Sequence, residues 1–236
     1  MKILYNNLLE STTLTATNEN GSYPITNTTH KYLEKKFMAT TTTSTITLSL
    51  AMSADVSAIA IGWHNLSSGT YILKDSGGST VGSGSLAVAE ETDITYFTAI
   101  TCKTIELSVV SADIVRIGGL GVGNPTHFLY HNTNPIIDYY DNDSSSFTAG
   151  GQLNGKKTAT LLRYTAVLGK ITNAQRKEVM DIIKSRGSIK PVYADLYALK
   201  HEEARPIYCR LAGNGAFKRQ SDSYDYTYTV VMEEVK

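Results

Sequence analysis

One helix signal limits what this chain can fold into. Thr172 is a natural N-cap, and Gln175 three residues later completes a capping box. Gly187 is placed for a left-handed C-cap, and Pro191 blocks any continuation of the helix. Between these ends an apolar stripe recurs at helical spacing and consists of Ala174, Val179, Ile182 and Ile183. The other segments have the patterns of strands and turns, so one helix has to pack its stripe onto a β-rich body.

The first half of the chain predicts a series of short strands. Ile46, Leu48 and Leu50 alternate with Thr and Ser, which is the period-two pattern of a half-buried strand. Residues 56–63 are more continuously apolar and predict a central strand. About seven or eight such segments fall within roughly 120 residues, a spacing typical of a β-sandwich or jelly roll. We therefore expect a β-sandwich over residues 1–123, with the glycine-rich run at 118–125 as its exit.

The second half of the chain predicts a different series of elements from the first. Residues 130–156 are rich in Asn, Asp, Ser and Gly, and we expect a long polar loop or arm there. A strand that is apolar on both sides covers residues 161–168, and the helix and further strands follow. One face of the last strand consists of Tyr224, Tyr226, Tyr228, Val230 and Met232. This order predicts an α+β domain over residues 124–236, with one helix packed on an antiparallel sheet, in a chain that is mainly β.

Charge and hydropathy narrow the range of partners. The chain has 22 basic and 22 acidic residues, a net charge of +0 and no basic cluster. Nucleic-acid binding depends largely on neutralising phosphates, so we expect none. Asn6 and Asn7 interrupt the apolar run that a signal peptide needs, so we expect a soluble protein that is not secreted by one. The longest apolar region, residues 46–63, contains Asp55 and several serines and is not a membrane span.

The motifs that would support catalysis or a cofactor are incomplete. The run that begins at Asp141 resembles the start of a calcium loop, but Ser146 stands where the turn glycine should be. The glycines at 119, 121 and 123 follow a strand without the spacing of a nucleotide-binding loop. We expect no enzyme activity, no cofactor and no metal site. For Cys102 and Cys209 we expect two buried free thiols, and a disulfide joining the two halves is the alternative.

The first domain resembles the discoidin or galactose-binding-like jelly roll found in many phage virion proteins. The segments that carry this resemblance are Asn7-Leu8-Leu9, Tyr23-Pro24-Ile25-Thr26-Asn27, His64-Asn65-Leu66, and residues 114–118 with Gly121 and Gly123. The second half is similar to the sheet-plus-helix domain of phage tail-tube, distal tail and minor tail proteins. Its matching segments are residues 172–175, Gly187, residues 191–195 and residues 228–234.

The resemblance implies a structural subunit of a phage tail or baseplate. Such a subunit is made in the host cytoplasm, sits in the virion tail and forms a ring, usually sixfold, that docks neighbouring tail proteins. The residues expected to make assembly contacts are Asp138, Tyr139, Tyr140, Tyr224, Tyr226 and Tyr228. The alternative is a carbohydrate-binding module that recognises host-surface glycans, with Trp63, Tyr71 and Tyr96 as candidate stacking residues.

Overall fold

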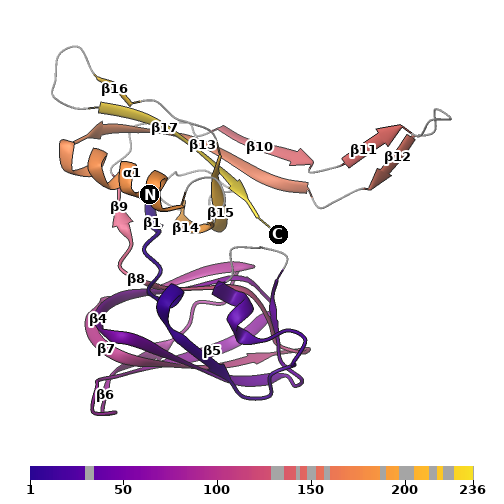
Figure 1. Ribbon diagram of the computed structural model, residues 1–236, viewed down its shortest axis with the longest axis vertical. Coiled ribbons are helices and arrows are strands. Elements are labelled where there is room, and N and C mark those ends of the chain that lie inside the picture. Colours follow the sequence, from indigo (N-terminus) through magenta and orange to yellow (C-terminus); the bar gives the residue numbers. More distant parts are fainter. Residues whose placement is uncertain are drawn as a thin grey trace.

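The computed structural model shows a mainly β protein. It describes residues 1–29, 35–128, 136–141, 144–147, 153–156, 160–186, 190–196, 205–212, 217–219 and 226–235. Within these ranges there are two large antiparallel sheets, one α-helix and two short 3-10 helices. Figure 1 shows the two sheets in two bodies, with the helix on the body that contains the C-terminal strands. The expectation of a mainly β fold with a β-sandwich is confirmed at this level.

The first body is a β-sandwich built from a single bent sheet. Its strands run in the order β3-β8-β4-β7-β5-β6, and β2 also pairs with β4. The 3-10 helices η1 and η2 span Leu8–Ser11 and Ile25–Thr29. The strand bounds are β2 Thr13–Ala16, β3 Phe37–Met38, β4 Thr43–His64, β5 Leu66–Lys74, β6 Thr80–Ser85, β7 Thr92–Ser111 and β8 Arg116–Gly123.

Strands β4 and β7 pass from one layer of the sandwich to the other. Their pairing shifts register between Ser49 and Ala54 and between Val56 and Ala58, and such irregularities let a strand bend. The first half of β4 pairs with β2 and the second half of β7, while the second half of β4 pairs with β8. Alternating residues such as Ile46, Leu48, Ile59 and Ile61 fill the core between the layers. The separate short strands expected from the sequence are therefore two long bent ones.

The second body contains the other large sheet. Its strands run in the order β10-β13-β17-β15-β14-β1-β9, and β16 also pairs with β17. The bounds are β1 Lys2–Leu4, β9 Thr126–His127, β10 Ile136–Asp141, β13 Thr160–Ile171, β14 Val192–Asp195, β15 Pro206–Ala212, β16 Phe217–Arg219 and β17 Tyr226–Glu234. A separate two-stranded sheet joins β11, Ser144–Phe147, to β12, Leu153–Lys156.

Strand β1 places the first residues of the chain in this second sheet. Ile3 lies opposite Ala194 of β14 on one side and opposite Thr126 of β9 on the other. The sandwich is therefore inserted between two strands that are neighbours in the second sheet. We had expected the second sheet to draw only on residues after 123. A three-residue strand carries too little pattern to reveal that it pairs more than a hundred residues away.

Helix α1, Asn173–Arg186, begins as its capping signal predicts. The Gln175 amide donates to the Thr172 hydroxyl at 3.2 Å, and the Gln175 side chain accepts from the Thr172 amide at 3.2 Å. Val179 and Ile182 are buried against sheet residues such as Tyr164 and Met232. Ala174, expected on the same stripe, is exposed, because it lies five positions before Val179 and therefore about 140° away from it around the helix. Gly187, the expected C-cap, lies outside the described residues.

Two further segments differ from the sequence expectation. The glycine run expected to be the exit from the sandwich belongs to strand β8, which pairs with β4 up to Gly123. The polar segment expected to be a loop or arm contains strands β10, β11 and β12. Figure 1 shows this segment as an arm that extends away from the second body. The arm is present, but its described parts are paired strands rather than loop.

Candidate functional site

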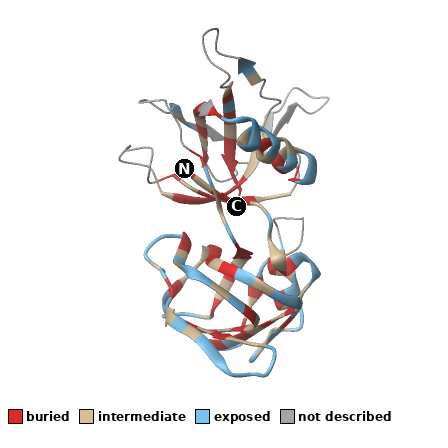
Figure 2. Ribbon diagram, turned by 90° about the vertical axis from the view of Figure 1, so that its left-hand side faces the viewer, coloured by how far each residue is buried: buried red, intermediate tan, exposed pale blue. Residues whose placement is uncertain are grey.

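A third cluster of buried side chains joins the two bodies. It contains Leu4, Ala58, Ala60, Ile94, Tyr193, Tyr208 and Val235, drawn from both sheets. Figure 2 shows buried residues in both bodies and where the two face each other. Ala58 and Ala60 alternate along β4 with Ile59 and Ile61, which fill the sandwich core. This half of β4 is therefore buried on both faces, which explains its continuous apolar sequence.

At the seam, the contact region between the two bodies, glycines make room for two tyrosine rings. A Cβ on Gly121 would lie 2.5 Å from Cε2 of Tyr193, and one on Gly62 would lie 3.0 Å from Cβ of Tyr208. A Cβ on Gly119 would lie 2.6 Å from the Tyr193 hydroxyl oxygen. The two rings pack on each other with centroids 4.7 Å apart and planes 30° apart. The glycines of β8 thus allow the second sheet to approach the sandwich closely.

Polar contacts hold the connection from β1 to the sandwich in place, and one of them crosses between the two bodies. Asn7 donates from Nδ2 to the Leu120 carbonyl at 2.8 Å, and its Oδ1 accepts from the Val122 amide at 3.0 Å. The Tyr96 hydroxyl donates to Asp195 Oδ2 at 2.8 Å across the seam. Burial, followed by the nearby Asp195 carboxylate, raises the pKa of Tyr96. These contacts hold the segment after β1, and the outer face of β7, in fixed positions.

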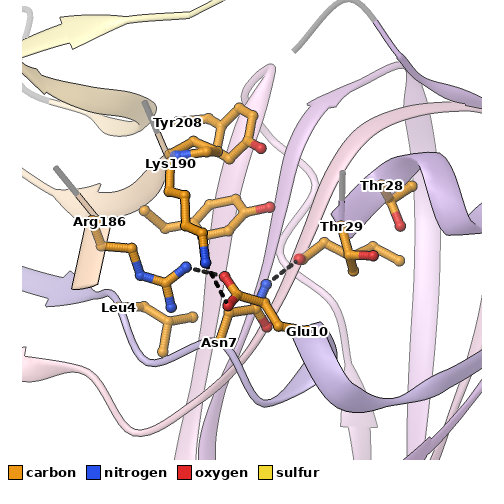
Figure 3. A pocket seen from close by; sticks show the side chains of 11 residues that line it. Leu4, Asn7, Glu10, Thr28, Thr29, Arg186, Lys190 and Tyr208 are labelled. Carbon is orange, nitrogen blue, oxygen red and sulfur yellow. Dashed lines mark hydrogen bonds and ion pairs between the residues drawn. The ribbon is translucent and has the colours of Figure 1, made fainter. Parts of the chain in front are cut away.

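A pocket of about 290 Å³ opens at this seam. Its polar residues are Asn7, Glu10, Thr28, Thr29, Arg186 and Lys190. Its apolar and aromatic residues are Leu4, Leu120, Pro191, Tyr193 and Tyr208. Figure 3 shows the Arg186 and Lys190 side chains converging on Glu10, with Thr28 and Thr29 across from them. The walls therefore come from η1, η2 and β8 of the first body and from β1, α1, β14 and β15 of the second.

The pocket carries an excess of one positive charge. Arg186 and Lys190 both contact Glu10, and the Lys190 Nζ to Glu10 Oε2 distance is 3.4 Å. The Arg186 side chain is only 6% exposed, whereas Lys190 is 45% exposed. The Nε of Arg186 and the hydroxyl of Tyr193 are buried, with no hydrogen-bond partner among the described residues. Burial also raises the pKa of Tyr193, so its hydroxyl stays protonated.

A second candidate site is the arm and the strand at its base. Among the described strands, β10 pairs only with β13, and Ile136 at its start is 57% exposed. Strands β11 and β12 pair only with each other in the described part of the arm. A free strand edge presents unpaired backbone donors and acceptors. The arm therefore offers edges to which another strand can add.

Charged residues fix the register of the strands at the base of the arm. Arg163 and Arg210 lie opposite Glu233 on either side of β17, and Asp138 of β10 lies opposite Arg163. Arg163 reaches Glu233 Oε1 at 2.6 and 3.0 Å, and Arg210 reaches Oε2 at 2.9 and 3.1 Å. Because a one-residue slip would separate these charges, the ladder holds β10, β13, β17 and β15 in one alignment.

The three candidate glycan-stacking residues do not meet on one open face. Tyr71 is 7% exposed and stacks on Phe97, with ring centroids 5.0 Å apart. Tyr96 is tied to Asp195, and the Lys2 ammonium lies 3.9 Å from the centroid of its ring. Trp63 packs partly buried against the cluster between the two bodies. Their use as a stacking set stays a prediction, and each is engaged within the molecule.

The candidate assembly residues fall into two groups. Asp138 lies exposed on β10, and Tyr139 and Tyr140 follow it in the same strand, with side chains outside the described ones. Tyr228 is buried against Phe217, with ring centroids 4.7 Å apart, and Tyr226 is partly buried. Tyr224 lies outside the described residues. A buried ring has no area to offer a partner, so the assembly role for Tyr228 loses its physical basis, while the β10 residues keep theirs.

The described residues contain no group of three His, Cys, Asp or Glu side chains placed to hold a metal ion. No helix within them is long and apolar enough to cross a membrane. Cys102 and Cys209 are buried free thiols, as expected, and not a disulfide. Burial, followed by a nearby carboxylate in each case, raises the pKa of both thiols. We assign no chemistry to either.

The chain is similar to solved sugar-binding modules. A mutant of chitosan-binding module 1 from a Paenibacillus sp. IK-5 chitosanase/glucanase is 16% identical, over 51% of this chain and 99% of that one, with a TM-score of 0.45. A family 32 module of C. perfringens, solved with galactose, is 16% identical over 51% and 97%, with a TM-score of 0.43. A Streptococcus pneumoniae fucose-binding module is 13% identical over 50% and 94%, with a TM-score of 0.43.

These neighbours are consistent with the jelly roll expected for the first domain. The comparisons give no indication of a phage tail protein, so that part of the expectation is not supported by them. No protein-family profile matches the chain, and no curated protein matches it. Because the TM-scores lie below 0.5, the likeness carries no argument about what this chain binds.

Proposed function

We propose that this chain is a structural subunit of a multiprotein assembly, and that the assembly is a phage tail or baseplate. The arm supports the assembly role. The likeness of the two domains to virion and tail proteins, seen in the sequence, supports the phage context. In this proposal the second sheet and its arm contact neighbouring subunits, usually six in a ring, and the sandwich faces outward or holds other tail proteins. The proposal assigns no catalytic step to the chain.

The observation that carries the proposal is the isolation of β11 and β12. A two-stranded sheet is marginally stable alone in water and needs a third strand or a packed face. In the described part of the arm, β11 and β12 have only each other. A strand from a neighbouring subunit would complete the sheet by backbone hydrogen bonds. We therefore expect the arm to gain order when it docks.

The test removes the tip of the arm and keeps its base. Deleting residues 144–156 leaves Asp141 and Thr160, the last pair of β10 and β13, joined by a five-residue connection. We expect the variant to keep the unfolding temperature of the wild type, because the core clusters lie elsewhere. We expect wild-type protein to form closed oligomers, and the variant to stay monomeric, by light scattering and negative-stain microscopy. A wild type that stays monomeric at all concentrations, or rings from the variant, would contradict the proposal.

A second candidate is recognition of host-surface glycans by the sandwich. The solved structures described above include chitosan-, galactose- and fucose-binding modules, which makes this the alternative to test. A glycan array with the full chain separates the two functions. Binding that is lost in a Trp63→Ala variant with an unchanged unfolding temperature would support glycan recognition through that ring. An array without hits would remove this candidate and leave the assembly role.

A further inference from the structure

We infer that the pocket between the two bodies binds a small molecule through one oxyanion group, a carboxylate or a phosphate. The inference does not depend on the assembly role. It rests on the net charge of the pocket, on two buried polar groups that lack hydrogen-bond partners in the described part of the chain, and on the size of the pocket. The pocket is lined by residues of both bodies, and the two unpartnered groups, on Arg186 and Tyr193, belong to the second body.

The charge of the pocket favours an anion. Arg186 and Lys190 share a single carboxylate, Glu10, so one positive charge remains without a counter-charge among the residues that line the pocket. The Arg186 guanidinium is almost fully buried, where a charge is costly unless it is paired and hydrogen-bonded. A guanidinium has donors in a planar fork that suits a carboxylate or phosphate. Glu10 occupies only part of this fork.

The two unpartnered groups point to a missing acceptor. The Nε of Arg186 can only donate, and the protonated hydroxyl of Tyr193 can donate as well. A buried donor without an acceptor costs about 1–3 kcal/mol. An oxyanion has several lone pairs and could accept from such donors together with Lys190. The opposite wall adds Thr28 and Thr29, which suit a polar rather than an apolar ligand.

The volume limits the ligand to a small one. Pockets for drug-sized ligands usually have about 300–1,000 Å³, and this one, at about 290 Å³, lies just below that range. A single sugar acid or a small phosphate ester is of suitable size. Because the walls come from both bodies, a bound anion would contact both. Ligand binding should therefore raise the unfolding temperature of the whole chain.

The test compares charged and neutral probes on the full chain by calorimetric titration at low salt. The probes are D-galacturonate, inorganic phosphate and D-galactose as the neutral match for galacturonate. We expect at least one anion to bind and galactose not to bind, with an affinity for the anion that falls as salt is added. Galacturonate alone or phosphate alone identifies the source of the oxyanion. No binding by either anion, or equal binding of galactose and galacturonate, would overturn the inference.

Two variants locate the site without relying on the buried ion pair. Lys190→Gln should weaken anion binding about 5- to 10-fold, the loss expected for one charge-assisted contact. Its control, Lys177→Gln, makes the same charge change on an exposed part of α1 away from the pocket and should leave binding unchanged. Tyr193→Phe should weaken binding but raise the unfolding temperature of the free protein, because it removes an unpaired buried hydroxyl. Equal losses in both lysine variants, or unchanged binding in Tyr193→Phe and Lys190→Gln, would contradict the assignment.

Discussion

At the scale of single residues, three glycines set how closely the two bodies approach. Gly62, Gly119 and Gly121 lie where the rings of Tyr193 and Tyr208 rest on the sandwich. Read along the chain, the run in β8 has the composition of a loop, and we expected an exit from the domain. The ring contacts come from β14 and β15, about seventy residues or more away, so no local pattern could reveal why these positions lack a side chain.

Gly121→Val should therefore weaken the seam rather than the strand. Overpacking a buried site typically costs about 1–3 kcal/mol of unfolding free energy, and this Cβ would lie 2.5 Å from a ring carbon. We expect a lower unfolding temperature by calorimetry, with the transition split into two as the bodies uncouple. Gly21→Ala is the control, because a Cβ there has no atom within 4 Å. An unchanged single transition in Gly121→Val would show that the rings do not hold the bodies together.

The candidate site residues also show that a local sequence pattern does not reveal contacts with distant parts of the chain. Trp63, Tyr71 and Tyr96 are candidate stacking residues in the sequence because they are aromatic, but strand alternation alone does not show which face a second body covers. The ion pairs of Arg163 and Arg210 with Glu233, and the pocket, could not be predicted either, because their residues are far apart in the sequence. Arg186, Glu10 and Tyr193 lie in three separate elements, and only the folded chain brings them together.

At the scale of elements, short sequence patterns correctly predicted the features that depend on residues close together in the chain. The capping box at Thr172 and Gln175 gave the start of α1, since its hydrogen bonds lie within one turn. The alternation of Ile46, Leu48 and Leu50 gave their burial in β4. What the pattern did not predict was continuity, because a bulge reads in sequence as a break between strands. The polar arm likewise read as a loop, since strands with little apolar content lack the usual alternation.

Removing the cap of α1 should have a measurable but limited effect. Thr172→Ala removes the hydroxyl that accepts from the Gln175 amide and should cost about 1 kcal/mol of unfolding free energy. Lys177→Ala, in an exposed mid-helix position, is the matched control and should stay within about 0.5 kcal/mol of the wild type. Chemical denaturation measures both. A loss in the control as large as in Thr172→Ala would assign the effect to the helix surface rather than to the cap.

At the scale of the whole molecule, the two bodies share buried groups whose pKa values are raised. Burial raises the pKa of Tyr193 and Tyr208 at the seam and of Cys209 in the second core. Each group stays protonated in the folded chain at a pH at which it ionises in the unfolded chain. The unfolded chain then binds fewer protons, so stability falls as the pH rises. The domain division after residue 123 stays a prediction. Whether the two bodies unfold together can be tested through the buried groups at the seam.

We therefore expect the stability of the chain to be insensitive to these groups below about pH 8 and to fall above about pH 9 to 10, where free cysteine and tyrosine ionise. The slope should reach about 1.4 kcal/mol per pH unit for each group that ionises only on unfolding. Denaturation series at stepped alkaline pH measure this slope. Tyr193→Phe should reduce it, and a slope unaffected by that change would place the alkaline sensitivity elsewhere.

The pairing of β1 with β9 also bears on how such a chain could diversify. The sandwich leaves the second sheet through one strand and returns through its neighbour, so its two ends lie side by side. An insertion of this kind is a separable module, because both of its ends lie at one place in the second sheet. A different module with close termini could be exchanged at the same two strands, and only the few seam residues would have to co-evolve. The second sheet and the sandwich inserted into it could then change at different rates over evolutionary time.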